Sequence, residues 1–216
     1  MRSPKGLIFD MDGVLVDSEP LHKRAKELAF AEVGIFLPES VYDSYKGRPD
    51  RTMLPEVLSA RGLSADKIEE ISQRKKHFYE ELEHELQAIR GATEFVKWAA
   101  SHYRIALATS ATSRNRKATL QLLGIGDLFH AVVDADGHTR PKPDPEVFLV
   151  ALERLRLRPD ECWIIEDSLN GLQAAKAAGC FTAAITTTFD KQTLSVAGAD
   201  LVVESFREIH TFLEST

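Results

Sequence analysis

The stretch that decides the fold is GLIFDMDG, residues 6–13. A short run of apolar residues is followed at once by two acidic residues, Asp10 and Asp12, and a glycine. A continuous apolar run of this length is typical of a strand buried in a parallel sheet. The acidic turn then lies at the carboxyl end of that strand, which is where ligands bind in open α/β sheets.

After this turn the hydrophobic pattern changes to the period of a helix. Ser18 is placed to cap a helix whose apolar residues recur at helical spacing: Leu21, Ala25, Leu28, Ala29 and Val33. Ser64 is placed to cap a second, longer helix. No strand pattern occurs between Asp17 and Ala88, so we expect this segment to be helical throughout.

From residue 91 onward, expected strands alternate with expected helices. Strands are expected at 105–108, 131–133, 162–165, 181–185 and 201–203. Helices are expected at 92–102, 114–123, 169–178 and 206–213. One more helix is expected to begin with Asp144 as its N-cap and Pro145 as its first residue. This alternation predicts an α/β fold with a mostly parallel sheet covered on both faces. We therefore expect a Rossmann-like, doubly wound core of residues 1–16 and 89–216 and an inserted all-α cap domain of residues 17–88.

Polar residues follow three of the expected strands. They are Asp10 and Asp12 after the first strand, Thr109 and Ser110 after the second, and Glu166 and Asp167 after a later one, with Lys142 on a loop between. Two unit charges about 4 Å apart repel by roughly 4 kcal/mol at an effective dielectric near 20. A hard divalent cation relieves that repulsion, and a donor set without histidine or cysteine favours Mg²⁺ over zinc.

The remaining groups at this edge of the sheet are hydrogen-bond donors. Thr109, the backbone amide of Ser110 and Lys142 stand beside the acidic cluster. Donors next to a Mg²⁺–carboxylate site suit a phosphoryl group. The sequence therefore predicts a site for phosphoryl transfer.

The same residues resemble, in order, the four motifs of the haloacid dehalogenase superfamily. The motifs are DMDGV at 10–14, Thr109 with Ser110, Lys142 within RPKPDP at 140–145, and EDSLNG at 166–171. The resemblance spans the chain. It implies an aspartyl-phosphate mechanism, and the acid at position 12 argues against dehalogenation, because true haloacid dehalogenases lack it.

The resemblance also implies a role for each motif residue. Asp10 is the expected nucleophile, and Asp12 the expected acid and base, whose carbonyl oxygen also binds the metal. Thr109 is expected to hydrogen-bond the transferred phosphoryl group, and Lys142 to neutralise its charge. Asp167 is expected to coordinate Mg²⁺, with Glu166 coordinating directly or through water.

The helical insert resembles the cap of the branch that contains β-phosphoglucomutase and sugar-phosphate phosphatases. By that resemblance, the expected substrate-binding residues are His22, Gly47, Arg48, Arg51 and Lys75 in the cap, with Ser110, Arg114 and Asn115 in the core. His22 resembles a histidine that governs the acid–base aspartate. Asp50 stands where the mutase carries an arginine that grips a second phosphate, so a second phosphate site is in doubt.

Composition excludes several other classes of function. The formal net charge is −6, which gives no electrostatic footprint for nucleic acid or an anionic membrane. No apolar run reaches the ~20 residues of a membrane span, and no secretory signal opens the sequence. Cys162 and Cys180 lack metal-ligand spacing and are expected to be reduced and buried. We expect a cytoplasmic protein, monomeric by default, that acts on a small molecule.

Three functions remain open at this point. The leading hypothesis is a Mg²⁺-dependent phosphatase of a small phosphorylated metabolite, with a sugar phosphate favoured. The second is a sugar phosphomutase of the β-phosphoglucomutase type, in which a sugar hydroxyl replaces water as the attacking group. The third is a non-enzymatic phospho-aspartate switch, against which the cap and Asp12 both argue.

Overall fold

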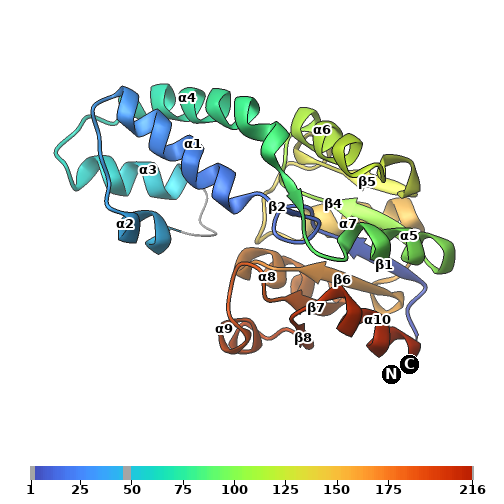
Figure 1. Ribbon diagram of the computed structural model, residues 1–216. Coiled ribbons are helices and arrows are strands. Elements are labelled where there is room, and N and C mark those ends of the chain that lie inside the picture. The colour runs from blue at the N-terminus through green and yellow to red at the C-terminus, as the bar shows by residue number, and fades with distance from the viewer. Residues whose placement is uncertain (1–2, 46–49, 216) are drawn as a thin grey trace. The chain divides into compact units, whose positions relative to one another are not determined.

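The computed structural model describes residues 3–45 and 50–215 (Figure 1). The chain divides into two compact units, one formed by Met1–Asp17 with Gln87–Thr216 and the other by Ser18–Leu86. We call them the core unit and the helical unit. Each contains its own cluster of buried apolar residues.

The core unit is built on a six-stranded sheet in the order β5-β4-β1-β6-β7-β8, and every pairing in it is parallel. The strands are β1 (Gly6–Phe9), β4 (Arg104–Ala108), β5 (Ala131–Val133), β6 (Cys162–Glu166), β7 (Phe181–Ile185) and β8 (Leu201–Val203). The four residues of β1 are all buried, as expected for a central strand covered on both faces. The expected doubly wound α/β fold is confirmed.

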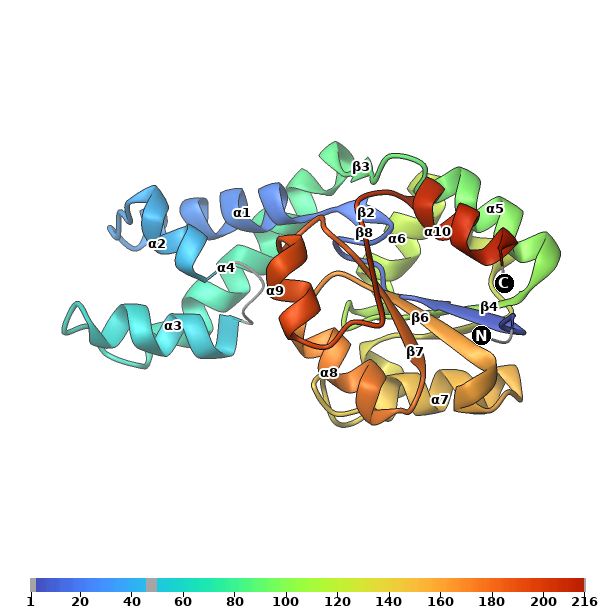
Figure 2. The same cartoon turned by 90° about the horizontal axis from the view of Figure 1, so that it is seen from below.

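Helices cover both faces of this sheet. They are α5 (Ala92–His102), α6 (Ser113–Leu123), α7 (Glu146–Leu155), α8 (Leu169–Ala177), α9 (Lys191–Val196) and α10 (Phe206–Glu214). Figure 2 shows α5 and α10 on one face of the sheet and α7 and α8 on the other. Phe148 and Leu152 of α7 are buried against Ile8 of β1 and Ile164 of β6, so this helix is fixed by apolar packing.

The helical unit contains α1 (Glu19–Glu32), α2 (Glu39–Ser44), α3 (Asp50–Ser59) and α4 (Lys67–Leu82). The helix α1 packs along α4 (Figure 1). Phe30, Met53, Leu58 and Ile71 are buried in the apolar cluster of this unit. All regular secondary structure in the described residues of Ser18–Leu86 is helical, as expected, but Asp17, Gln87 and Ala88 at the ends of the expected helical segment lie in short strands.

Some expected element boundaries were wrong. Helix α7 begins one residue later than expected, with Pro145 as the N-cap, although the Asp144 carboxylate still accepts a hydrogen bond from the backbone amide of Glu146 at 3.0 Å, as a capping aspartate does. Asp66, not Ser64, is the N-cap of α4. Ser18 is the N-cap of α1 as expected, but its side chain makes no capping hydrogen bond.

Two features were missed in the sequence. The helix α9 has six residues and buries only Leu194, so it leaves no periodic apolar stripe to detect. The two segments in which the chain passes from one unit to the other pair as antiparallel strands, β2 (Val16–Asp17) with β3 (Gln87–Ala88). Strands of two residues are too short to show an alternating pattern.

Both cysteines, Cys162 and Cys180, are buried and unpaired, and burial raises the pKa of each thiol to about 12. The expectation that they are inert core residues is therefore supported. None of the helices in the described part of the chain combines the length and the apolar character needed to cross a bilayer.

Candidate active site

The register of the sheet brings the polar strand ends together. Phe9 of β1 pairs with Leu107 of β4 on one side and with Ile165 of β6 on the other. The backbone amide of Asp10 donates to the carbonyl oxygen of Ile165 at 3.0 Å, which extends the pairing to the end of β1. Asp10 therefore lies between the ends of β4 and β6.

Lys142 is the cation at the centre of this site. Its Nζ donates to Oδ1 of Asp10 at 2.6 Å, to Oε1 of Glu166 at 2.6 Å and to the carbonyl oxygen of Ala108 at 3.3 Å. It also lies 4.7 Å from the ring centroid of Phe148. Burial lowers the pKa of Lys142, but the charges of Asp10 and Glu166 outweigh it and the net pKa is raised. The lysine is a fixed positive charge.

One lysine does not balance the acids around it. Burial raises the pKa of Asp10 to about 7, Lys142 opposes this rise, and the charges of Glu166 and Asp12 add to it. Burial also raises the pKa of Asp167, with the charges of Glu166 and Asp10 adding to the effect. Burial is the main cause of both raised pKa values, and the repulsion between the carboxylates adds to it; a bound cation would relieve that repulsion.

The donor set fits a hard cation. Asp10, Glu166 and Asp167 each offer an oxygen, and these atoms lie within 4.8 Å of one another. Glu166 uses Oε1 on Lys142 and Oε2 on the amides of Asp167 and Ser168 and the Ser168 hydroxyl, each at 3.0 Å. In contrast, Oδ2 of Asp10 and Oδ1 of Asp167 accept no hydrogen bond from any residue that the structure describes. Asp10 and Asp167 could therefore hold Mg²⁺ directly, and Glu166 fits better as an anchor or a ligand through water.

Two glycines allow the backbone to approach these carboxylates. A Cβ at Gly171, in the first turn of α8, would lie 1.9 Å from the Glu166 carboxyl carbon. A Cβ at Gly13 would lie 1.9 Å from Oδ2 of Asp167, and Gly13 also has a positive φ of 74°. Any larger residue at either place would displace a carboxylate of the cluster.

Thr109 follows β4 and is fully buried. Its amide donates to the carbonyl oxygen of Val133 at 2.9 Å, and its hydroxyl oxygen accepts from the amide of Ala111 at 3.0 Å. Ser110 is exposed. The structure thus fixes Thr109 at the sheet edge and leaves the side chain of Ser110 to the solvent.

The first turn of α6 carries the expected pair Arg114 and Asn115. Arg114 is exposed and donates from Nη1 to Oδ1 of Asn115 at 3.2 Å, so the two side chains lie together. The next arginine, Arg116, pairs with Asp134 at the end of β5, with Nη2 2.8 Å from Oδ2. Sequence reasoning missed this pair, although Asp134 directly follows a buried strand, as Asp10 does.

Hydrogen bonds to the Glu146 carboxylate hold together the loop that carries Lys142. Glu146 accepts hydrogen bonds from the amide of Arg140 at 2.7 Å, from Nε of Arg140 at 3.1 Å and from the hydroxyl of Thr139 at 3.1 Å. The bond from the Arg140 amide is the main reason that the pKa of Glu146 is lowered to about 2. Arg140 also pairs with Asp144 at 3.2 Å. The only local signal for this network is a glutamate in the first turn of a helix.

The helical unit contains its own polar cluster. Nζ of Lys75 lies 2.6 Å from Oδ2 of Asp50, and Nζ of Lys26 lies 3.7 Å from Oδ1. His22 stacks on Tyr79 with 4.4 Å between ring centroids. Burial, together with the charges of Lys75 and Lys26, lowers the pKa of His22 to about 3, so this histidine is neutral. Lys75 interrupts the apolar stripe of α4 because it pairs with Asp50.

The structure gathers some of the expected site residues and not others. Asp10, Lys142, Glu166 and Asp167 form one cluster, and the charge of Asp12 acts on Asp10. The expected specificity residues Gly47 and Arg48 lie outside the described residues. Arg51 is in the first turn of α3, but its side chain is not among those that the structure describes.

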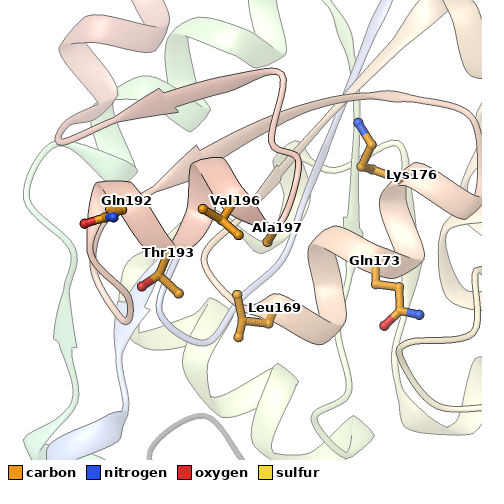
Figure 3. A pocket seen from close by; sticks show the side chains of 7 residues that line it. All are labelled: Leu169, Gln173, Lys176, Gln192, Thr193, Val196 and Ala197. Atoms are coloured by element: carbon orange, nitrogen blue, oxygen red, sulfur yellow. The ribbon is translucent and has the colours of Figure 1, made fainter.

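A separate hollow of about 650 Å³ lies between α8 and α9 (Figure 3). It is lined by Leu169, Gln173, Lys176, Gln192, Thr193, Val196 and Ala197. Leu169 is the one motif residue among them, and neither Lys142 nor any of the clustered carboxylates lines the hollow, so it is not part of the acidic site.

Comparisons with known proteins agree with the motifs. The family model for haloacid dehalogenase-like hydrolases matches residues 4–179. A phosphorylated carbohydrates phosphatase of Thermotoga maritima is 37% identical over 179 residues, which cover 81% of this chain and 82% of that protein. The β-phosphoglucomutase of Bacillus subtilis is 31% identical over 214 residues, which cover 95% and 91%. A solved structure of a hydrolase from Pseudomonas syringae matches with a TM-score of 0.82 at 26% identity, over 98% of each chain.

Proposed function

The chain belongs to the haloacid dehalogenase-like hydrolases, and we propose that it is a Mg²⁺-dependent phosphatase of a sugar phosphate that works through an aspartyl-phosphate. The observation that carries this proposal is the buried cluster around Lys142. Lys142 binds one oxygen of Asp10 and leaves the other without a hydrogen bond from the described residues. The two oxygens of Asp10 thus have different surroundings, and in the proposed mechanism one attacks phosphorus while the other holds the cation.

In the proposed mechanism, Asp10 forms a bond to phosphorus as the bond to the sugar oxygen breaks. This divides one hard displacement into two easier ones. Asp12, two residues along the same turn, protonates the leaving sugar oxygen and then takes a proton from the water that hydrolyses the intermediate. Lys142 holds Asp10 in place and offsets the negative charge of the transferred group.

Other residues bind the phosphoryl group and the sugar. Thr109, the amide of Ser110, Arg114 and Asn115 are the proposed phosphate ligands in the core unit. His22 and Lys75 are proposed to contact the sugar from the helical unit, which we take to be the cap. Mg²⁺, held by Asp10, Asp167 and the carbonyl oxygen of Asp12, would neutralise phosphate oxygens when bound.

The choice of a carbohydrate substrate is supported by the Thermotoga maritima relative, whose name specifies phosphorylated carbohydrates. Similarity to the Bacillus subtilis β-phosphoglucomutase keeps a mutase as the second candidate. Asp50 argues against the mutase, because its carboxylate pairs with Lys75 and Lys26 and so reduces the positive charge available for a second phosphate. The cytoplasmic location and monomeric state expected from the sequence remain predictions.

One experiment separates the two candidates. Purified protein is incubated with Mg²⁺ and β-glucose 1-phosphate, with a trace of the hexose 1,6-bisphosphate, and both glucose 6-phosphate and inorganic phosphate are measured in the same tube. The phosphatase proposal predicts that inorganic phosphate dominates, here or with another member of a sugar-phosphate panel. Glucose 6-phosphate forming far faster than inorganic phosphate would overturn it in favour of the mutase.

A further inference from the structure

Two adjacent threonines in the loop after β7 bind both sides of the acidic site. The hydroxyl of Thr188 donates to Oδ2 of Asp167, and the hydroxyl of Thr187 donates to the carbonyl oxygen of Gly13. Neither threonine belongs to the motifs that identify the family. The mechanism proposed above also gives neither of them a role.

The contact made by Thr188 determines how Asp167 can present its oxygens. The Asp167 side chain is buried and lies directly against Gly13, where a Cβ would come within 1.9 Å of Oδ2. With Oδ2 held by Thr188, the carboxylate cannot rotate freely about its bond to Cβ. Oδ1, which accepts no hydrogen bond from the described residues, is then the oxygen left for a cation.

We propose that Thr188 is a positioning residue for the cation site, which sets the orientation of Asp167 before the metal binds. This inference rests on the Mg²⁺ site in the proposed function. Hydrogen bonds to the ligands of a metal contribute to its affinity, and their loss typically weakens binding by about 10- to 100-fold. Thr187 supports the same arrangement from the other side, because its hydroxyl donates to the carbonyl oxygen of Gly13, the residue against which Asp167 lies.

A purely structural role for Thr188 has a different signature. In that case the hydroxyl only satisfies a buried carboxylate oxygen, and its removal lowers stability without a selective effect on metal affinity. A second threonine–aspartate pair, with its threonine in the strand that precedes this loop, provides the matched control. Thr182, fully buried in β7, donates from its hydroxyl to Oδ2 of Asp200 at 2.8 Å, and Asp200 is not part of the acidic cluster.

The test is calorimetric titration of Mg²⁺ into metal-free protein, which does not depend on turnover. Thr188→Val keeps the shape of the side chain and removes the donor, so we expect the dissociation constant to rise about 10-fold. Thr188→Ser keeps the donor, and we expect it to stay within about 2-fold of the wild type. Thr182→Val should lose stability in urea but bind Mg²⁺ like the wild type.

Each possible result either supports or overturns the positioning role of Thr188. Equal Mg²⁺ affinity in Thr188→Val and the wild type would overturn the inference, as would an equal loss in Thr182→Val. If Thr188→Val does not fold, Thr188→Ala and Thr188→Ser are compared in its place. If the wild type itself binds no Mg²⁺, the cation site of the proposed function fails, and the inference fails with it. This outcome is distinguishable, because neither the wild type nor any variant then shows heat of Mg²⁺ binding.

Discussion

Replacing Lys142 with methionine tests the electrostatic structure of the site. Methionine fills most of the space of the lysine side chain but leaves Asp10 and Glu166, both buried, without the Nζ that lies 2.6 Å from each. Removing one partner from a buried ion pair costs roughly 3–5 kcal/mol. We expect the free energy of unfolding at pH 7.5, in the absence of Mg²⁺, to fall by about this amount.

The cost should depend on pH in a definite direction. In the variant, the pKa of Asp10 lies further above its unfolded value than in the wild type, where it is about 7. A group with a raised pKa in the folded state contributes stability below its unfolded pKa and loses it as the pH rises through the folded pKa. The wild type also loses stability up to its folded pKa of about 7, so the extra loss in the variant comes from the last half unit below pH 7.5. Since one pKa unit corresponds to about 1.4 kcal/mol, we expect the destabilisation to be about 0.7 kcal/mol smaller at pH 5.5 than at pH 7.5.

The assay is urea unfolding followed by tryptophan fluorescence. Both tryptophans, Trp98 in α5 and Trp163 in β6, lie in the core unit, so the signal reports on the unit that contains the substitution. The control is Lys176→Met, because Lys176 is 43% exposed and lies 3.5 Å from Asp200, and its loss should cost at most about 1 kcal/mol. A Lys142→Met protein as stable as the wild type at pH 7.5, or more destabilised at pH 5.5, would refute the reasoning.

Two further predictions concern positioning and pH. Glu146→Ala releases the loop of Lys142, and we expect kcat for phosphate release to fall roughly 10- to 100-fold, because a small misplacement of a catalytic group is costly. The unfolded-state pKa of His22 is about 6.5 and its folded-state pKa is about 3, so the wild type loses stability as the pH falls from 6.5 towards 3. Relative to His22→Gln, that loss should be about 2 kcal/mol between pH 6.5 and pH 5, measured by urea unfolding with circular dichroism.

Each of these predictions has its own control. Glu161 accepts hydrogen bonds from the amide of Arg158 and from Nζ of Lys5, in the same manner as Glu146 but at the other end of the sheet. Glu161→Ala should therefore leave kcat unchanged, and an equal fall in both variants would point to general destabilisation. For His22, parallel stability curves for the wild type and His22→Gln across this pH range would contradict the lowered pKa.

Much of the fold and of the acidic site could be predicted from the sequence because the signals are local. A buried strand such as β1 or β5 is a continuous apolar run, and the residue after a parallel strand lies at a known edge of the sheet. Asp10 and Glu166 could be placed together on that ground alone. Lys142, on a loop between two strands, was expected beside the same cluster, but its hydrogen bonds to both Asp10 and Glu166 depend on the tertiary fold.

The remaining features depend on contacts between distant parts of the chain. Thr187 and Gly13 are 174 positions apart, and no local pattern links them. Thr188 sits in a run of three threonines after a strand, which also suits an ordinary loop. Lys75 breaks the stripe of α4, but its partner Asp50 could be identified only from the packing of α3 on α4.

The central claim is that Asp10 carries the reaction as a nucleophile. The most direct measurement is inorganic phosphate release from a sugar monophosphate in the presence of Mg²⁺, by the wild type and by Asp10→Asn, with the fold of both checked by urea unfolding. We expect the variant to fold and its turnover to fall on the order of 10³-fold or more. A folded Asp10→Asn protein that turns over near the wild-type rate would contradict it.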